Sequence, residues 1–172
     1  MSFQMTEELE DQFRALAYDR TEPFCYSCYR IVGNEHDKVY AVAAQSIEGN
    51  SYSLETWDAE THGYFCHKCG SDDLMRHLEG VGVEWSIEWV IESLIESECG
   101  LVDEEAAYDE LLDELYPPYE IGYSKFFASD ILKENDPICY RIGKQEHFDD
   151  QVHEGILIEC NGSYYTPDCV AA

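Results

Sequence analysis

EWSIEWVIESLIESECGLVDEEAAYDELLDEL, residues 84–115, joins two runs of helical periodicity with an excess of acidic side chains. Apolar residues recur three and four positions apart, which predicts amphipathic helices over 84–99 and 104–116. Gly100 is typical of the residue after a helix, and Asp103 is a favourable N-cap for the next one. Because the connection is short, we expect the two helices to pack as an antiparallel pair.

Acidic residues in this stretch recur every fourth position, so each set is expected to form a row along one helix face. Like charges at this spacing destabilise an isolated helix by about 0.2–0.5 kcal/mol per pair. The wider segment 77–124 contains fourteen acidic residues and no Lys or Arg, and it carries −14 of the net charge of −27. We therefore interpret the rows as a negative surface for a positively charged partner. The rows consist of Glu84, Glu88, Glu92 and Glu96, and of Glu105, Asp109 and Asp113.

The spacing of these carboxylates can be compared with that of the phosphates in DNA. One helical row presents a carboxylate about every 6 Å, and two adjacent rows present one about every 3 Å. Duplex DNA carries one negative charge per roughly 1.7 Å of its axis. The acidic pair is therefore a candidate mimic of nucleic acid. The chain has no D-x-D-x-D-G calcium loop, and nothing singles out a carboxylate pair for glycoside hydrolysis.

Two cysteine pairs precede this stretch: Cys25 and Cys28 in PFCYSCYR, and Cys66 and Cys69 in GYFCHKCGS. Each two-residue gap allows both thiolates of one turn to face a single ion, and two such turns complete a tetrahedral four-cysteine zinc site. Four protein ligands leave no open position, so one structural zinc per chain is expected. A disulfide pair and a redox motif are the alternatives, and His62 is an alternative ligand.

The residues around the cysteine pairs favour a zinc ribbon over 23–70. KVYAVAAQSI (38–47) and NSYSLETW (50–57) are separated by a Gly-Asn turn signal, which predicts a β-hairpin between the two pairs. Helices are expected over 6–19 and 71–80, with Thr6 and Ser71 as N-caps.

The C-terminal segment is predicted to form a β-α-α-β-β lobe. Asn161-Gly162 favours a type I′ turn between its last two strands. The predicted elements are a strand within 119–127, a helix capped by Ser129 and ended by Pro137, a helix over 137–155, and strands 156–160 and 163–166. The fold class is thus α+β, divided into a helix and zinc ribbon (1–82), an acidic helical pair (83–118) and this lobe (119–172).

Four cysteines occur singly, and we expect them to be buried in the core. A second metal site and a Cys–His nucleophile pair are alternatives that no local motif supports. The single cysteines are Cys99, Cys139, Cys160 and Cys169, and the alternative sites would use His147, His153, Cys160 and Cys169.

Composition limits the function classes. A chain of 172 residues with 45% hydrophobic residues can bury a core despite its acidity. Its charge opposes direct binding to nucleic acid or to anionic membranes. No segment resembles a signal peptide or a membrane span, so a cytoplasmic protein is expected.

Three stretches resemble a known group of proteins: CHKCGSDDLMRHLEGVGVEW (66–85), DPICYRIGKQEHFDD (136–150) and GSYYTPDCV (162–170). They are similar to small acidic accessory proteins encoded by phages and plasmids, which pair an N-terminal zinc ribbon with a C-terminal segment of this kind. The resemblance implies a mobile-element origin and the host cytoplasm as location. By analogy with antirestriction DNA mimics, it also implies neutralisation of host defence.

These observations lead to three functional hypotheses. The favoured one is a non-enzymatic DNA mimic that occupies the nucleic-acid site of a basic host protein, of the restriction or CRISPR type. The second is a zinc-stabilised protein–protein adaptor with an apolar contact surface, whose acidity serves solubility. The third is an enzyme that uses Cys or His residues of the C-terminal lobe, such as Cys139 or Cys160.

Overall fold

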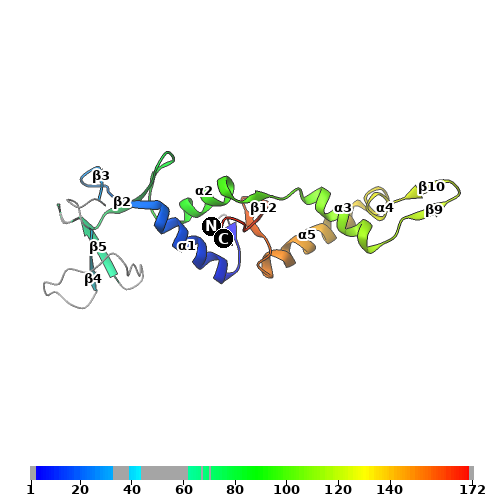
Figure 1. Cartoon of the computed structure of the whole chain (residues 1–172), viewed down its shortest axis with the longest axis horizontal. Helices are drawn as coiled ribbons and strands as arrows, with labels where there is room; N and C mark the ends of the chain where they lie inside the picture. The colour runs from blue at the N-terminus through cyan, green and yellow to red at the C-terminus, as the bar shows by residue number, and fades with distance from the viewer. Residues whose placement is uncertain (1–2, 33–38, 44–61, 67, 70, 171–172) are drawn as a thin grey trace. The chain divides into compact units, whose positions relative to one another are not determined.

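The computed structural model describes residues 3–32, 39–43, 62–66, 68–69 and 71–170, which form a mixed α+β structure with antiparallel sheets (Figure 1). The chain divides into two compact units. We call residues 14–91 the cysteine unit, and residues 1–13 with 92–172 the C-terminal unit. The boundaries between the units fall inside helices α1 (Glu7–Arg20) and α2 (Glu88–Glu98). The domain boundaries predicted from the sequence lie after residues 82 and 118.

The cysteine unit is built on a four-stranded antiparallel sheet with the order β3-β2-β6-β7. Its strands are β2 (Thr21–Cys25), β3 (Arg30–Ile31), β6 (Leu74–Leu78) and β7 (Gly82–Glu84). A separate two-stranded sheet pairs β4 (Val39–Ala43) with β5 (His62–Cys66).

Buried Arg76 on β6 ties this sheet to the end of α1. Its Nε and Nη2 donate to the hydroxyl of Thr21 at 2.9 and 2.7 Å, and Nη2 also donates to the Thr21 carbonyl at 2.8 Å. The guanidinium lies 5.0 Å from the ring centroid of Tyr18. These neutral acceptors and the ring compensate the guanidinium for the hydration that it loses on burial.

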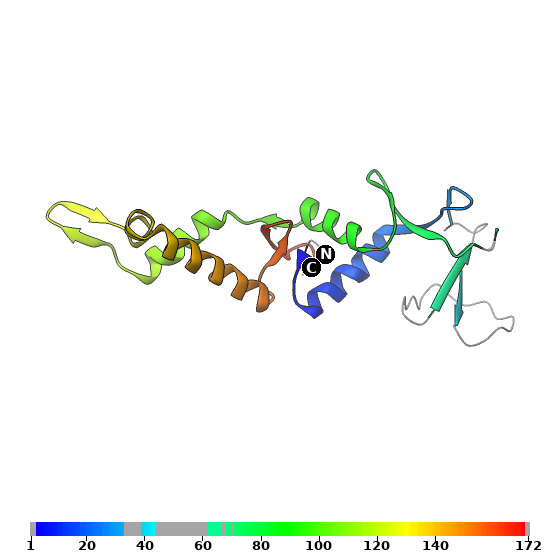
Figure 2. The same cartoon turned by 180° about the vertical axis from the view of Figure 1, so that it is seen from behind.

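The C-terminal unit combines a four-stranded sheet with three helices. The sheet has the order β1-β11-β12-β8, from β1 (Phe3–Gln4), β11 (Ile158–Cys160), β12 (Ser163–Thr166) and β8 (Gly100–Leu101). Helices α3 (Glu104–Leu115), α4 (Ala128–Asn135) and α5 (Pro137–His153) lie together in both views (Figures 1 and 2). A hairpin of β9 (Tyr119–Ile121) and β10 (Ser124–Phe126) connects α3 to α4.

The core of the C-terminal unit lies between these helices and the sheet. Phe148 and Tyr164 stack with ring centroids 4.9 Å apart, and Tyr108 meets Tyr140 edge to face at 5.2 Å. Such pairs stabilise by about 0.5–1.5 kcal/mol beyond the burial of their area. The buried cluster is Tyr108, Leu112, Tyr140, Phe148, Val152, Leu157 and Tyr164.

Several sequence predictions are confirmed. The helix expected over 6–19 is α1, and the one expected over 137–155 is α5. The turn between β11 and β12 has φ of 52° at Asn161 and 78° at Gly162, and both residues of a type I′ turn require positive values.

One helix prediction is wrong, and another helix begins later in the chain than expected. Residues 74–78, expected to be helical, form β6, because a complete antiparallel ladder to β2 outweighs a weak local helix preference. The helix expected over 84–99 begins only at Glu88. Ser86 has a φ of 69°, a left-handed backbone that a right-handed helix cannot include, so Glu84 remains at the end of β7.

The pairing of other elements also differs from expectation. Helix α3 packs on α4, and α4 on α5, instead of α3 forming an antiparallel pair with the preceding acidic helix. The N-cap of α4 is Phe127, and Ser129 lies inside the helix. Strand β4 falls in the predicted hairpin segment 38–47 but pairs with β5, while the predicted partner strand 50–57 lies outside the described residues.

Candidate metal centre and acidic surface

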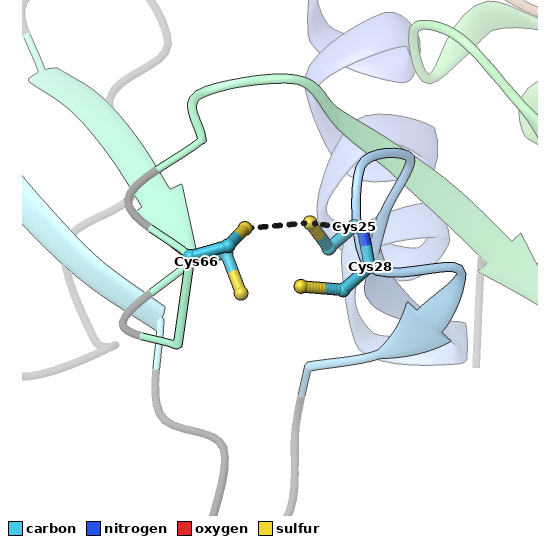
Figure 3. A group of neighbouring side chains, drawn as sticks. Cys25, Cys28 and Cys66 are labelled. Carbon is cyan, nitrogen blue, oxygen red and sulfur yellow. Dashed lines mark hydrogen bonds between the residues drawn. The ribbon is translucent and has the colours of Figure 1, made fainter.

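The four paired cysteines converge on one point in the cysteine unit. Their sulfur atoms all lie within 4.8 Å of one another, and Sγ of Cys25 is 3.7 Å from Sγ of Cys69. Metal–sulfur bonds of about 2.3 Å give a tetrahedron with edges of about 3.8 Å. A disulfide requires about 2.05 Å, so the separation matches shared ligation of an ion and not a covalent bond. Figure 3 shows Cys25 and Cys28 pointing toward Cys66.

Two tight turns position the ligands. Cys25 ends β2 and Cys66 ends β5, and each second cysteine follows in the next turn. The backbone N–H of Cys28 donates to Sγ of Cys25 at 3.4 Å, an interaction that stabilises a thiolate. Tyr29, directly after the first pair, has a φ of 54°, the left-handed value for which glycine is usually selected.

Hydrogen bonds between and within the two turns hold the cysteine pairs in place. The hydroxyl of Ser27 donates to that of Ser71 at 2.9 Å, and the N–H of Cys66 donates to the carbonyl of Ser71 at 2.7 Å. Cys25 and Cys66 are fully buried beside Val32, while Cys69 is exposed. The site is therefore closed toward the core and open to solvent on one side.

The thiols differ in acidity. Burial raises the pKa of Cys25. A hydrogen bond to Cys69, followed by desolvation, raises the pKa of Cys28 to about 12. Cys69 accepts that bond and another from the backbone of Ser71, which lower its pKa to about 7. Ligation of a metal would displace the remaining protons, and a complete set of four thiolate ligands would leave no position for substrate.

The predicted first acidic row is divided between a strand and a helix. Glu84 is exposed at the end of β7. Glu88 accepts hydrogen bonds from the N–H of Ile87 at 3.1 Å and from Arg14 at 3.2 Å. Burial opposes ionisation of Glu88, yet bonds from Ser86 and the backbone, with the charge of Arg14, lower its pKa. Glu88 therefore serves the start of α2 rather than an open surface.

The remaining members of that row lie further along α2. Glu92 is half-buried, and Glu96 is exposed. The carboxylate of Glu96 accepts a hydrogen bond of 2.8 Å from the side chain of Asn161, in the turn between β11 and β12.

The second row, Glu105, Asp109 and Asp113, does lie along one face of α3, and that face meets α4 and α5. Lys133 on α4 donates to Glu105 at 2.7 Å and to Asp109 at 2.5 Å. The hydroxyl of Tyr140 on α5 donates to the other oxygen of Asp109 at 2.8 Å. The bonds to Asp109 and Glu105 raise the pKa of Lys133 above its usual range. These carboxylates thus join the three helices.

Asp113 caps the first turn of α4 from the neighbouring helix. Its carboxylate accepts from the backbone N–H of Ser129 at 3.0 Å and from the Ser129 hydroxyl at 3.1 Å. The N-cap residue Phe127 has no side chain able to accept, so Asp113 supplies from α3 the acceptor that the first turn lacks. A negative charge at this helix end is also favoured by the helix dipole.

Other acids of α3 face solvent. Glu110 and Glu114 are exposed, four residues apart, on the face away from buried Tyr108 and Leu112. They are not among the binding residues predicted from the sequence. The apolar positions of α3 indicated that these two lie opposite the core, whereas Asp109 and Asp113 flank it.

Basic residues in the C-terminal unit are few and mostly engaged. The unit contains 24 acidic and 4 basic residues, a net charge of −20. Lys133 is held as described, Lys125 pairs with Glu120 at 3.1 Å, and Lys144 pairs with Glu104 at 3.2 Å. Three of the four cations are therefore already neutralised within the unit.

The single cysteines do not form a second centre. Among the described residues, the group with metal-ligand geometry is the one at Cys25. Cys160 is buried as expected, whereas Cys139 is exposed and Cys99 and Cys169 are half-buried. Burial raises the pKa of Cys160 to about 11. Burial, and then a hydrogen bond with Cys169, raise that of Cys99 to about 12.

Of the candidate histidines, His147 has structural contacts and His153 is exposed. His147 lies between the rings of Tyr108 and Phe148, with centroids 5.9 and 5.3 Å away, and its Nε2 is 3.1 Å from the amide nitrogen of Gln151. His62, the alternative metal ligand, begins β5 opposite Ala43, and its side chain is outside the described part of the structure.

Comparison with protein-family models, with curated proteins and with solved structures gives no match to this chain. No helix in the described residues is long and apolar enough to cross a membrane.

Proposed function

We propose that the chain is a non-enzymatic, metal-stabilised binding protein that recognises a basic protein partner. The observation that carries this proposal is the charge of the C-terminal unit, −20, with three of its four cations held in internal ion pairs. Such a field attracts a basic partner over roughly a Debye length, about 8 Å at physiological salt, and accelerates association.

The more specific form of the proposal is a DNA mimic that inhibits a host defence protein of the restriction or CRISPR type. The net charge of the C-terminal unit and the resemblance to acidic proteins of phages and plasmids support it. Glu110 and Glu114, about 6 Å apart along α3, together with Glu96 of the same unit, supply exposed charges for this role. Asp109 and Asp113 contribute mainly by holding the helices that display them.

Salt dependence tests the electrostatic proposal. A partner retained from the native host cytosol at low salt and eluted by a salt step would be purified and titrated at several salt concentrations. We expect log Kd to rise linearly with log salt, as for proteins that bind the phosphates of DNA. An affinity that does not change with salt would exclude the mimic.

Matched charge variants locate the contact. One variant changes Glu96, Glu110 and Glu114 to Gln in the C-terminal unit. The control changes three exposed acids of the cysteine unit, Glu22→Gln, Asp72→Asn and Glu79→Gln. Both remove three charges, so a non-specific effect of net charge would be equal. We expect the first variant to bind about tenfold more weakly than the control and to show a smaller salt slope.

We further propose that the ion at the four-cysteine site is zinc with a structural role. Four thiolates in a tetrahedron suit Zn²⁺, and iron is the other common occupant of such a set. Elemental analysis of protein purified without added metal should give one zinc per chain, and chelation should unfold the cysteine unit. Cys69→Ser should lose the metal, whereas Cys139→Ser, which changes another exposed thiol, should keep it.

One observation favours the adaptor as a second candidate function. The β9–β10 hairpin exposes large apolar side chains, including Ile121 at 71% and Tyr119 at 57%. If partner binding survives the Glu96, Glu110 and Glu114 substitutions and their loss of charge, the contact is apolar and the adaptor explains the protein better.

A further inference from the structure

The β9–β10 hairpin has two chemically different faces. Tyr119 pairs with Phe126, Ile121 with Ser124, and Glu120 with Lys125. Paired residues point to the same side of a sheet, and successive residues point to opposite sides. Tyr119, Ile121 and Phe126 therefore share one face. Glu120 and Lys125 share the other, where their side chains form an ion pair of 3.1 Å.

The apolar face of this hairpin is uncovered. Tyr119, Ile121 and Phe126 are 57%, 71% and 43% exposed. The tip is a two-residue turn in which Gly122 has a φ of 66° and the following Tyr123 is fully exposed. Glycine at the first turn position is typical of a type II′ turn, which matches the twist of the two strands. The turn thus fixes the register and, with it, the segregation of the faces.

Exposed apolar side chains continue on both sides of the hairpin. Leu115 and Tyr116 precede it and Phe127 follows it, each at least 45% exposed. Single exposed apolar residues are ordinary, but a group that shares one face, as on this hairpin, marks an interaction surface. A two-stranded hairpin is also marginally stable alone in water, so an apolar face of this kind gains stability when a partner covers it.

Charge identifies the kind of partner. Exposed Glu114 lies just before the hairpin and exposed Asp130 just after it, while the one cation of the hairpin, Lys125, is paired on the opposite face. Two copies of a unit with a charge of −20 repel each other, and that repulsion opposes self-association through this face.

We propose that the apolar face of the β9–β10 hairpin, formed by Tyr119, Ile121 and Phe126, inserts into an apolar groove rimmed by Lys or Arg side chains on a basic protein. This inference rests on the proposed function and names the anchor of the same interaction. The acidic surroundings guide association, and the buried aromatic and aliphatic side chains provide most of the lifetime of the complex.

Two labelled peptides of equal length and charge test the anchor by fluorescence anisotropy. In one, lysine alternates with valine; in the other, lysine alternates with serine. The wild-type chain should bind the lysine–valine peptide about tenfold more tightly, which corresponds to ~1.4 kcal/mol. A variant with Tyr119, Ile121 and Phe126 changed to Ser should lose this preference and keep its affinity for the lysine–serine peptide.

The matched control exchanges the ion pair on the opposite face, Glu120→Lys with Lys125→Glu, which leaves the net charge unchanged. It should keep the preference for valine. Because the three apolar side chains are exposed, their replacement should leave the far-UV circular dichroism unchanged. If the triple variant unfolds, Ile121→Ser alone, at the most exposed of the three positions, decides the question by the same loss of preference.

Three outcomes would overturn the proposal: equal affinity of the wild type for both peptides, a preference that persists in the hairpin variants, or a wild-type dimer in sedimentation that these variants dissociate. The last result would make a second copy the occupant. Failure of the proposed function can be distinguished from failure of this anchor. It would appear as no binding, or as salt-independent binding, of the lysine–serine peptide by the wild type.

Discussion

Replacement of Asp113 by Ala separates a structural role of the acidic rows from a binding role. The Asp113 carboxylate accepts two hydrogen bonds from Ser129, at 3.0 and 3.1 Å, and faces the start of α4. Bonds to a charged group contribute about 1.5–3 kcal/mol each when shielded from water. Asp113 is half-buried, so the lower limit applies and the pair contributes roughly 3 kcal/mol. The better helix propensity of Ala offsets about 0.5 kcal/mol.

We therefore expect Asp113→Ala to lower the free energy of unfolding by about 2.5 kcal/mol. Urea unfolding followed by far-UV circular dichroism measures this, with the metal site kept loaded and the m-value compared between variants. Glu114→Ala is the control, because Glu114 is the next residue of the same helix and its carboxylate is exposed. It should leave the urea midpoint unchanged.

Two further variants refine the test. Asp113→Asn keeps an oxygen acceptor but removes the charge, so its effect should lie between those of the wild type and Asp113→Ala. Ser129→Ala removes one of the two bonds, and a double-mutant cycle with Asp113→Ala should give a coupling energy of about 1.5 kcal/mol. Equal stability of Asp113→Ala and Glu114→Ala would refute the structural role and return Asp113 to the binding surface.

The remaining predictions concern buried polar groups and a close contact. Burial and the bond to a carboxylate raise the pKa of Tyr140 to about 12 from 10.0, so the folded state holds a proton that the unfolded state releases. The contribution of the protonated Tyr140 to the free energy of unfolding is complete below pH 10 and should be lost between pH 10 and 12. Alkaline unfolding of the wild type should show this loss, and Tyr140→Phe, which has no hydroxyl to titrate, should not. Gly143→Ala, favourable in most helices, should destabilise by about 1–3 kcal/mol because its Cβ would collide with the Tyr108 hydroxyl; combination with Tyr108→Phe should relieve part of this loss in thermal unfolding. Arg76→Lys should lower stability by about 2 kcal/mol, since lysine cannot reproduce the paired bonds to Thr21, and an unchanged melting temperature would contradict that assignment.

Short-range chemistry made part of this protein predictable from its sequence. The doubled two-residue spacing of the cysteines predicted the four-sulfur cluster, because each turn needs only the geometry of its own few residues. Asn161-Gly162 predicted the last hairpin for the same reason, since positive φ at two successive positions is a local requirement. Helices α1 and α5 followed from their amphipathic periodicity and their end signals.

The orientation of the acidic rows could not be predicted in this way. A fourfold spacing places Glu105, Asp109 and Asp113 on one face of α3, but it does not say what that face meets. The partners Ser129 and Tyr140 lie 16 and 31 residues further along the chain than the carboxylates they contact. Their positions depend on how α4 and α5 fold back, which no local pattern of α3 encodes.

Sequence alone thus determined the strong negative charge, the four-cysteine cluster and the presence of helices in the acidic region. Tertiary structure decided which of the acids are used to hold the C-terminal unit together and which remain free to meet a partner. It also converted residues 74–78 from a predicted helix into a strand, because the ladder with β2 and the bonds of Arg76 exist only when the two segments are paired. The physical reason is the same in each case: spacing fixes local geometry, whereas burial and long-range hydrogen bonds depend on segments that meet only in the folded chain.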